Sequence, residues 1–330
     1  MVMGFWEKFK KGKEGAKTPF FALAPMADVT DCAFRQIIAK YGKPDIFWTE
    51  FVSVDGLCSV GKEKLLIDLK YGENERPIVA QIFGNDPEHF ERVARMLVEM
   101  GFDGIDINMG CPVKKILNQN SCSALIRTPE LAKEIILATK RGAGEIPVSV
   151  KTRIGFSKVE IDTWIPSILE TEPAALTVHL RTVKEMSLVP AHWELMKQIV
   201  DIRDNMGKET LILGNGDVTD LEDGRKKAAE TGCDGVMLGR AIFGNPWLFS
   251  EKVPTIQEKL DVMIEHTKLF EKMLGTHKNF ALMKKHYKAY VNGFDGAKEL
   301  RVRLMEAENA VEVERMVGDF LSKNPIELPV

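Results

Sequence analysis

Short apolar runs alternate with longer amphipathic stretches from about residue 20 to residue 250, a spacing typical of repeated strand–helix units. Eight of the runs are rich in Val, Ile and Leu and lack a regular polar alternation, which favours parallel strands covered on both faces. These runs are Phe20–Met26, Asp45–Phe51, Pro77–Gly84, Gly104–Cys111, Pro147–Ile154, Ala175–Thr182, Thr210–Asp217 and Gly235–Arg240.

The stretches between these runs carry helical signals, and the predicted helices include Pro87–Met100, Pro129–Arg141 and Thr219–Thr231. Asp86 and Thr128 each precede a proline, so each is expected to cap a helix that begins at that proline. Gly101 and Gly232 are expected at the carboxyl ends of helices.

Eight strand–helix units within about 230 residues match the usual size of a (β/α)8 barrel. The alternative is a doubly wound open sheet, which would place a G-x-G-x-x-G motif after its first strand. Here the first run ends in Pro25-Met26-Ala27 instead. We therefore predict an α/β fold of the (β/α)8 TIM-barrel class.

The strand pattern stops after Phe249, and residues 256–323 carry helical patterns interrupted by Gly275, Gly293 and Gly296. This change predicts a separate all-helical module. The expected domains are a catalytic barrel over residues 1–250 and a helical domain over residues 251–330.

The composition mainly excludes certain classes of protein and kinds of site. The 330 residues are 45% hydrophobic and 28% charged, which is ordinary for a globular protein with a sizeable core. The formal net charge of −3 means that any contact with RNA needs a local basic patch. The five cysteines form no CxxC pair, so we expect reduced thiols, a cytoplasmic protein and no metal site. Because no 18-residue apolar run occurs, neither a membrane span nor a signal peptide is expected.

Residues able to bind or react stand at the carboxyl end of nearly every predicted strand, where barrel enzymes place their active sites. They are Pro25-Met26-Ala27, Glu50, Gln81, Asn108 with Cys111, Lys151 with Arg153, His179 with Arg181, Asn215-Gly216-Asp217, and Gly239-Arg240. One polar strand end is commonly a solvated loop residue. A purely structural barrel would not need a whole ring of them, so we expect a functional site here.

The last two strand ends are glycine-rich and predict a phosphate site. Gly214-Asn215-Gly216 and Gly239 would let backbone N–H groups approach an anion, and the loops after the seventh and eighth strands commonly bind phosphate. Arg240 adds a guanidinium for charge-assisted hydrogen bonds. The alternative is that these glycines serve tight turns only.

Cys111 is the candidate acid or nucleophile. It follows Asn108-Met109-Gly110 at a strand end, in a polar and rigid setting. A buried structural role, the usual one for a free cysteine, suits Cys32, Cys58 and Cys233 better.

Lys151 and His179 also stand at strand ends. An ammonium group cannot be buried without a partner, so a cofactor anion or a polarised carbonyl is expected beside Lys151. A single histidine is usually a core residue, but His179 is followed by Arg181 on the same side of the predicted strand.

From Phe21 to about Phe249 these residues resemble the tRNA-dihydrouridine synthase family, with the bacterial B-type branch as the closest likeness. The motifs that carry the resemblance are Ala24-Pro25-Met26-Ala27-Asp28-Val29-Thr30-Asp31, Gly104-Ile105-Asp106-Ile107-Asn108-Met109-Gly110-Cys111-Pro112, Val150-Lys151-Thr152-Arg153, Val178-His179 with Arg181-Thr182, Asn215-Gly216-Asp217, and Gly239-Arg240 with Asn245-Pro246-Trp247. The helical tail with Lys284-Lys285-His286 resembles the RNA-binding domain of the family.

The resemblance implies that FMN, reduced by NADPH, passes hydride to C6 of a flipped-out uracil in tRNA, and that Cys111 protonates C5. The FMN-binding residues would be Pro25, Met26, Ala27, Gln81, Lys151, His179, Asn215, Gly216, Asp217, Gly239 and Arg240. The substrate-binding residues would be Asn108, Arg153, Arg181, Lys284, Lys285 and Lys288.

Three positions depart from the family pattern. Cys122 and Leu180 stand where the family often has Gly, and Val183 stands where it often has Arg. These departures concern substrate contacts or the branch of the family, whereas the FMN positions are intact.

Two other functions stay open from the sequence. One is an FMN barrel that acts on a small molecule, as dihydroorotate dehydrogenase does, but this function does not need a basic helical tail. The other is a non-catalytic RNA-binding protein, which would not need Cys111 together with the flavin-binding residues. The modified tRNA position and the oligomeric state stay open as well.

Overall fold

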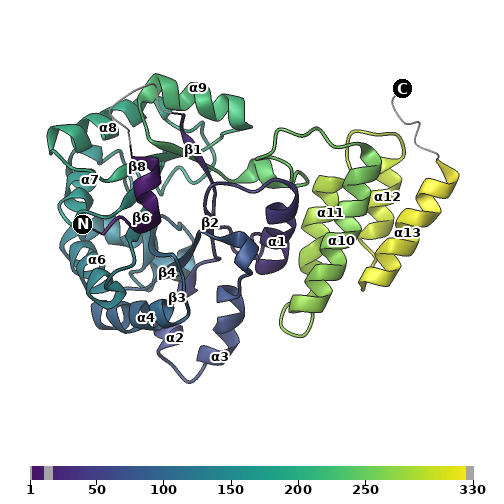
Figure 1. The fold of residues 1–330 in the computed structure, drawn as a ribbon, viewed down its shortest axis with the longest axis horizontal. Coiled ribbons are helices and arrows are strands. Elements are labelled where there is room, and N and C mark those ends of the chain that lie inside the picture. Colours follow the sequence, from purple (N-terminus) through teal and green to yellow (C-terminus); the bar gives the residue numbers. More distant parts are fainter. Residues whose placement is uncertain (1, 11–17, 325–330) are drawn as a thin grey trace. The chain divides into compact units, whose positions relative to one another are not determined.

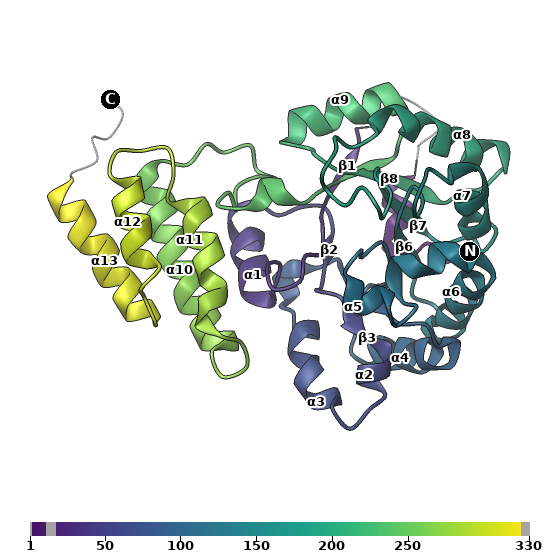
Figure 2. The ribbon, with the colours of Figure 1, turned by 180° about the vertical axis from the view of Figure 1, so that it is seen from behind.

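The computed structural model describes residues 2–10 and 18–324 (Figures 1 and 2). The chain forms two compact units. The first comprises Met1–Met26 and Pro44–Gly239, and the second comprises Ala27–Lys43 and Arg240–Val330. Each unit is therefore assembled from two separate stretches of the chain.

The first unit is a nearly closed barrel of parallel strands, which confirms the predicted fold class. Its strands follow the order β1-β9-β8-β7-β6-β5-β4-β2. An isolated parallel bridge links Ala22 of the first strand in this order to Ile46, the residue just before the last strand. The strands are β1 (Phe20–Leu23), β2 (Phe47–Trp48), β4 (Ile78–Phe83), β5 (Gly104–Met109), β6 (Val148–Arg153), β7 (Ala175–His179), β8 (Leu211–Asn215) and β9 (Gly235–Leu238).

Each predicted strand contains one of these strands, and the burial of nearly all strand residues agrees with the lack of polar alternation in the sequence. The sequence did not predict the additional short strand β3 (Val52–Ser53), which pairs with β4.

Helices surround the strands of the barrel (Figures 1 and 2). They include α4 (Pro87–Glu99), α6 (Pro129–Ala143), α7 (Ile161–Leu169), α8 (Met196–Asn205) and α9 (Leu221–Thr231), with the shorter α2 (Val54–Leu57), α3 (Lys62–Leu65) and α5 (Lys114–Leu117). The Asp86 side chain caps α4 as predicted, because it accepts hydrogen bonds from the N–H groups of Glu88 and His89. Thr128 is the N-cap residue of α6 and Pro129 is its first helical residue, as predicted, although the Thr128 side chain makes no capping hydrogen bond.

The amino ends of the strands are covered by the chain's own N-terminal segment. The 3-10 helix η1 (Gly4–Phe9) buries Trp6, whose ring lies 5.9 Å from Phe20 and 6.0 Å from Trp48 between centroids. Burying one large apolar side chain contributes about 1.5–3 kcal/mol, so this segment is part of the barrel core.

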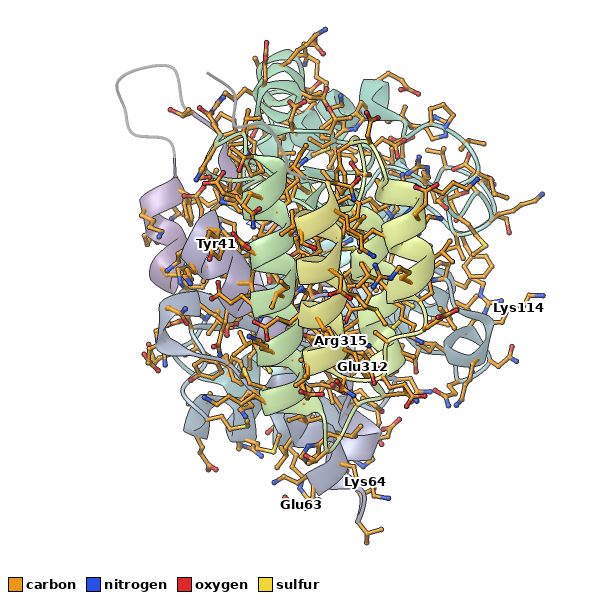
Figure 3. The ribbon with its side chains drawn as sticks, turned by 90° about the vertical axis from the view of Figure 1, so that its right-hand side faces the viewer. Tyr41, Glu63, Lys64, Lys114, Glu312 and Arg315 are labelled. Atoms are coloured by element: carbon orange, nitrogen blue, oxygen red, sulfur yellow. The ribbon has the colours of Figure 1, made fainter. Side chains whose placement is uncertain are left out.

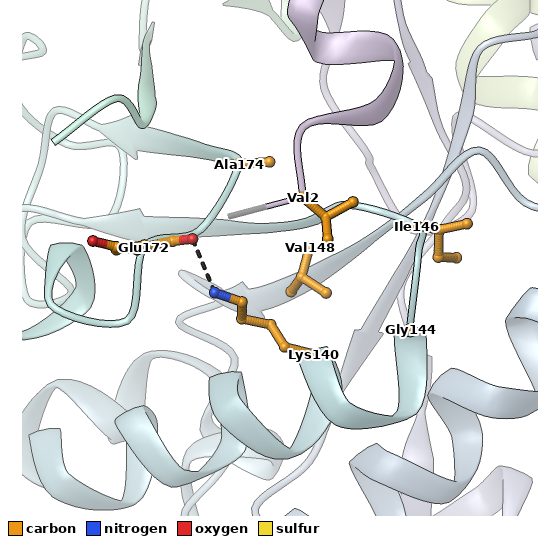
Figure 4. A pocket seen from close by; sticks show the side chains of 7 residues that line it. All are labelled: Val2, Lys140, Gly144, Ile146, Val148, Glu172 and Ala174. Atoms are coloured by element: carbon orange, nitrogen blue, oxygen red, sulfur yellow. Dashed lines mark hydrogen bonds between the residues drawn. The ribbon is translucent and has the colours of Figure 1, made fainter.

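A small pocket lies at the same end of the barrel (Figure 4). Among the described residues that line this pocket, Lys140 is the only lysine. Its Nζ donates hydrogen bonds to the backbone carbonyls of Thr171 (2.8 Å) and Glu172 (3.1 Å). The ring of predicted site residues lies at the opposite, carboxyl end of the strands.

The second unit is helical, as predicted for the C-terminal part of the chain. It contains α1 (Cys32–Tyr41), α10 (Ile256–Leu274), α11 (Lys284–Tyr290), α12 (Ala297–Leu304) and α13 (Ala310–Lys323). Helix α10 ends at Leu274, directly before Gly275, and Gly296, with φ of +78°, precedes α12, as the glycine breaks predicted. Helix α1 packs against α10, so residues far from the tail in sequence share its core. Among the described helices, none has the length and apolar character needed to cross a bilayer.

Candidate active site

The carboxyl ends of the parallel strands meet at one rim of the barrel, and most of the predicted site residues stand there. Strand register places Gln81 beside Asp106, Asn108 beside Lys151, and Arg153 beside His179. His179 in turn is beside Asn215. Pro25 and Met26 follow β1, and Gly239 follows β9. Ala27 and Arg240 come next in the chain and are the first residues of their segments of the second unit.

A line of hydrogen bonds connects the buried strand ends to the loop that carries Cys111. Gln81 Nε2 donates to Asp106 Oδ2 over 2.7 Å, and Gln81 Oε1 accepts from Asn108 Nδ2 over 2.9 Å. Asn108 Oδ1 then accepts from the backbone N–H groups of Gly110 and Cys111, both at 3.0 Å. The loop is therefore fixed by a side chain of the strand that precedes it.

Lys151 lies next to this line, and its ammonium group is desolvated. Its Nζ donates to Asn215 Oδ1 over 3.1 Å, and Asn215 Nδ2 donates to the carbonyl of Met237 over 2.8 Å. Burial, followed by the nearby Arg153 guanidinium, lowers the pKa of Lys151 to about 8. Because an ammonium group has three donors, Lys151 can also bind a carbonyl or an anionic group of a ligand.

The thiol of Cys111 has an unusually low pKa of about 7. The largest cause is a hydrogen bond with the Cys122 thiol, and the positive charges of Arg153 and Lys151 act in the same direction against burial. Cys122 is fully buried, which raises its own pKa, so it remains protonated and can donate. The Ser123 hydroxyl also donates to the carbonyl of Cys111 over 2.7 Å. The sequence marked Cys122 only as a departure from a family pattern.

Arg153, an expected substrate contact, is largely used by the protein itself. Its Nε donates to the carbonyl of Gly110 over 2.8 Å, and its Nη1 donates to the carbonyls of Thr182 (3.1 Å) and Met186 (3.0 Å). Burial lowers the pKa of this guanidinium to about 10. The side chain therefore stabilises the loop of Cys111 from the end of β6.

Arg181 is also buried and braces a loop. Its Nε donates to the carbonyl of Val189 over 2.6 Å, its Nη2 pairs with the Asp217 carboxylate, and its Nη1 lies 3.2 Å from His179 Nε2. Asp217 accepts from the N–H of Ala191 over 2.9 Å as well. The guanidinium thus orients His179 and Asp217, two of the predicted cofactor residues.

The three glycines of the predicted phosphate site differ in what the fold demands of them. A Cβ at Gly214 would lie 2.4 Å from the Trp193 ring, and Gly216 combines φ of +130° with a contact of 2.7 Å to Ala191. A Cβ at Gly239 would meet only ordinary contacts, at 3.6 Å from Ala24 and 3.9 Å from Met26. Turn and packing requirements explain Gly214 and Gly216, whereas packing does not require glycine at position 239.

The predicted tRNA-contacting lysines share helix α11. Lys288 is exposed and Lys284 and Lys285 are half-buried. His286 does not belong to this surface, because it is buried in the core of the second unit, 4.7 Å from His266 between ring centroids. In the first unit, Lys114 extends from α5 at the surface (Figure 3).

Comparison with known proteins identifies relatives over nearly the whole chain. The model of the dihydrouridine synthase (Dus) family matches residues 22–324. The chain is 42% identical over 326 residues to a probable tRNA-dihydrouridine synthase of Staphylococcus aureus strain MRSA252, which covers 97% of this chain and 96% of the relative. It is 41% identical over 329 residues to the probable tRNA-dihydrouridine synthase 2 of Bacillus subtilis strain 168, with 98% of both chains covered.

Solved structures of low sequence identity share the fold. A 2-naphthoyl-CoA reductase complex has a TM-score of 0.54 at 11% identity and covers 94% of this chain and 68% of its own. Histamine dehydrogenase from Rhizobium sp. 4-9 has a TM-score of 0.52 at 12% identity and covers 80% of this chain and 50% of its own. At these identities the likeness supports the barrel architecture and nothing about the substrate.

Proposed function

The chain belongs to the dihydrouridine synthase family, and from this premise we propose that it reduces specific uridines in tRNA to 5,6-dihydrouridine. FMN would be the bound cofactor and NADPH the reductant. The observation that carries the proposal is the position of Cys111, a low-pKa thiol on a fixed loop beside Lys151 at the rim of the barrel. The names of the relatives in Staphylococcus aureus and Bacillus subtilis support tRNA as the substrate.

The residues at the rim fit an anionic flavin nucleotide. We assign the flavin ring to the side chains that line it or donate to its edge, which are Pro25, Met26, Ala27, Gln81 and Lys151. His179, Asn215, Gly216, Asp217, Gly239 and Arg240 would hold the ribityl chain and phosphate. The ammonium donors of Lys151 and the presence of a glycine at position 239 that packing does not require support this assignment. Bound FMN supplies the hydride chemistry that no amino-acid side chain can provide.

Cys111 would complete the reduction by general acid catalysis. When hydride adds to C6 of the uracil, the C5–C6 electron pair moves to C5, which then takes the proton from the Cys111 thiol. The resulting thiolate is stabilised by the Cys122 hydrogen bond and by the charges of Arg153 and Lys151. A group with a pKa near the working pH is the most effective general acid, and the value of about 7 meets this condition.

The target uridine must leave the base stack before it can reach the barrel rim. Asn108, Arg153 and Arg181 would lie at the uracil end of the substrate. The helical domain over residues 251–330, with Lys284, Lys285 and Lys288 on α11, would bind the tRNA backbone.

Replacing Cys111 by alanine tests the proposed role. We expect Cys111→Ala to retain FMN and NADPH-dependent flavin reduction, because neither step needs the thiol proton. Dihydrouridine formation in unmodified tRNA should fall by about 10²–10⁴-fold, the usual contribution of a general acid. The readout is the dihydrouridine content of the tRNA as a function of time.

Cys233→Ala is the matched control, because Cys233 is buried in the same unit but lies at the amino end of β9. It should turn over tRNA at the wild-type rate. Full activity of Cys111→Ala would remove this thiol from the mechanism. Wild-type protein that reduces orotate but not tRNA would support the small-molecule alternative.

A further inference from the structure

A buried carboxylate that the proposed mechanism does not use stands two residues before Asn108. Asp106 has no solvent exposure, and residues two apart on a strand point to the same side of the sheet. Its Oδ1 accepts from the Ser149 hydroxyl over 2.6 Å, and its Oδ2 accepts from Gln81 Nε2 over 2.7 Å. Burying a carboxylate is costly, and burial raises the pKa of Asp106 to about 6, against the hydrogen bonds from Ser149 and Gln81 and the nearby positive charge of Lys151.

Asp106 fixes the direction of the two amide side chains that follow it. An ionised carboxylate only accepts hydrogen bonds, so Gln81 must present its NH₂ group to Asp106 and its carbonyl oxygen to Asn108. Asn108 must then present its NH₂ group to Gln81 and its oxygen to the loop.

The Cys111 loop, at the other end of this line of hydrogen bonds, requires the same orientation of the two amide groups. Two backbone N–H groups, those of Gly110 and Cys111, converge on Asn108 Oδ1 at 3.0 Å each. An acceptor-only group at one end and two donor-only groups at the other therefore agree on a single arrangement of both amides. If either amide were reversed, donors would face donors inside a buried site, which costs about 1–3 kcal/mol per unsatisfied group.

We propose that Asp106 is a positioning residue that fixes the Cys111 loop through the relay formed by Gln81 and Asn108. It does not touch the substrate. Its charge sets the direction of the relay, and the relay holds the thiol in place beside Cys122, Arg153 and Lys151. The effect on uridine reduction rests on the proposed function, but the effect on the Cys111 thiol does not.

Asp106→Asn tests the relay with little change in side-chain volume. The Ser149 hydroxyl donates to Oδ1 of this side chain over 2.6 Å, and its other acceptor, the Ile105 carbonyl, is 3.5 Å away, so the oxygen of the new amide is expected to stay with Ser149 and its NH₂ group to face Gln81. This arrangement favours reversal of the Gln81 amide, and then of the Asn108 amide, which would turn a donor toward the two loop N–H groups. The Cys111 loop would be released and its thiol would move away from the neighbours that lower its pKa. The midpoint of the pH profile for Cys111 alkylation, measured by mass spectrometry of the Cys111 peptide, should therefore move upward toward the ordinary thiol value.

Displacing a catalytic group by about 1 Å can cost roughly 100-fold in rate, so dihydrouridine formation in tRNA should fall by about 10- to 100-fold in this variant. The matched control is Asp234→Asn, which replaces an equally buried carboxylate paired with Arg203 before β9, at the amino end of the strands. It should leave the alkylation midpoint at the wild-type value even where it lowers stability.

A second variant restores the direction of the relay. In Asp106→Asn combined with Gln81→Glu, the new amide donates to the new carboxylate, and the carboxylate still accepts from Asn108. Relay coupling predicts that the alkylation midpoint of the double variant lies closer to wild type than that of either single variant, whereas independent roles predict additive changes. If Asp106→Asn alone does not fold, the alkylation midpoint of the double variant is compared with that of Gln81→Glu, and relay coupling predicts that the double variant lies closer to wild type.

An unchanged alkylation midpoint in folded Asp106→Asn, or strictly additive changes in the double variant, would overturn the relay. The alkylation arm needs neither tRNA nor NADPH. If wild-type protein alkylates as expected but does not reduce tRNA, the proposed function fails and the relay stands.

Discussion

Among single residues, the most informative position is Cys122. It adopts φ of +55°, in the left-handed region that non-glycine residues rarely enter, and its side chain is fully buried. A side chain in such a conformation costs on the order of 1–3 kcal/mol and persists only where the surroundings hold it. The hydrogen bond to Cys111 gives this side chain a chemical role that glycine could not fill.

Cys122→Ala is expected to raise the pKa of Cys111, because the variant removes the principal hydrogen-bond donor to the thiolate. The protonated thiol then persists to higher pH, and the midpoint of Cys111 alkylation moves upward from about 7. Mass spectrometry of the Cys111 peptide between pH 5 and pH 10 gives this midpoint. Cys233→Ala, at a cysteine buried elsewhere in the barrel, should leave it in place. A Cys122→Ala profile that overlays the wild-type profile would contradict the role.

Among the elements, helix α11 separates two kinds of side chain. His286, Tyr287 and Tyr290 are buried, while Lys284, Lys285 and Lys288 lie toward its accessible side. Arg301 and Arg303 of α12 are already engaged, with the carbonyl of Val291 and with Asp319 respectively. Helix α11 is therefore the part of the described tail that we expect to meet a polyanion.

Charge reversal of Lys284, Lys285 and Lys288 to Glu should weaken tRNA binding and flatten its dependence on salt. Each neutralised phosphate releases counterions, so the slope of log affinity against log salt should become shallower by about 0.7–0.9 for each phosphate that the variant no longer neutralises. FMN content and NADPH oxidation should stay at wild-type values. The measurement is tRNA affinity at several salt concentrations.

The control reverses three lysines on or near barrel helices α8 and α9, Lys197, Lys208 and Lys226. It should retain both affinity and slope. If the α11 variant behaves like this control, the RNA site lies elsewhere, and Lys114 and Lys115 of α5 become the next candidates.

The buried histidines of the second unit make its stability depend on pH. Desolvation lowers the pKa of His286 to about 3 and that of His266 well below its usual value, and Phe34 stacks on His266 at 4.7 Å. The unfolded chain binds protons at these histidines below about pH 6.5, but the folded unit does not. Stability is therefore fully present above about pH 6.5 and declines as the pH falls.

The expected decline in the free energy of unfolding is about 1.4 kcal/mol per pH unit for each histidine below about pH 6.5. Chemical denaturation between pH 7.5 and pH 5 measures it. His266→Phe, which keeps an aromatic ring against Phe34, should make this dependence less steep, and His277→Gln at an exposed histidine serves as the control. An equal slope in wild type and His266→Phe would count against the explanation.

In the molecule as a whole, the helical unit is not only the C-terminal tail. Helix α1 follows the first strand of the barrel, yet its buried residues Phe34, Ile37 and Ile38 belong to the second unit, where α1 packs against α10. The first strand–helix connection of the barrel thus supplies part of the core of the other unit.

Truncation after residue 250 is therefore expected to produce a protein that aggregates. Without α10, the apolar face of α1 with Phe34 and Ile38 is uncovered, and an exposed apolar patch of this kind promotes aggregation. Residues 1–250 should bind a hydrophobic dye and elute as aggregates in size-exclusion chromatography, while the full chain should not. A well-behaved truncated barrel that retains flavin would contradict this expectation.

The barrel and the ring of residues at its rim follow from the amino-acid sequence alone. Parallel strands carry their carboxyl ends to one side, so the order of elements along the chain was sufficient to bring Gln81, Asn108, Lys151, His179 and Asn215 together. The apolar runs and the glycine breaks likewise predicted the strands and the helical tail, because periodicity and helix-ending residues act locally.

Contacts between residues far apart in sequence decide which of these side chains form hydrogen bonds within the protein. Arg153 contacts the carbonyl of Gly110, 43 residues away in sequence, and Gln81 contacts Asp106, 25 residues away. The contact between Cys122 and Cys111 and the inclusion of α1 in the helical unit arise in the same way. Hydrogen-bond partners, burial and the resulting pKa values depend on groups that meet only after folding, and no local pattern of the sequence encodes them.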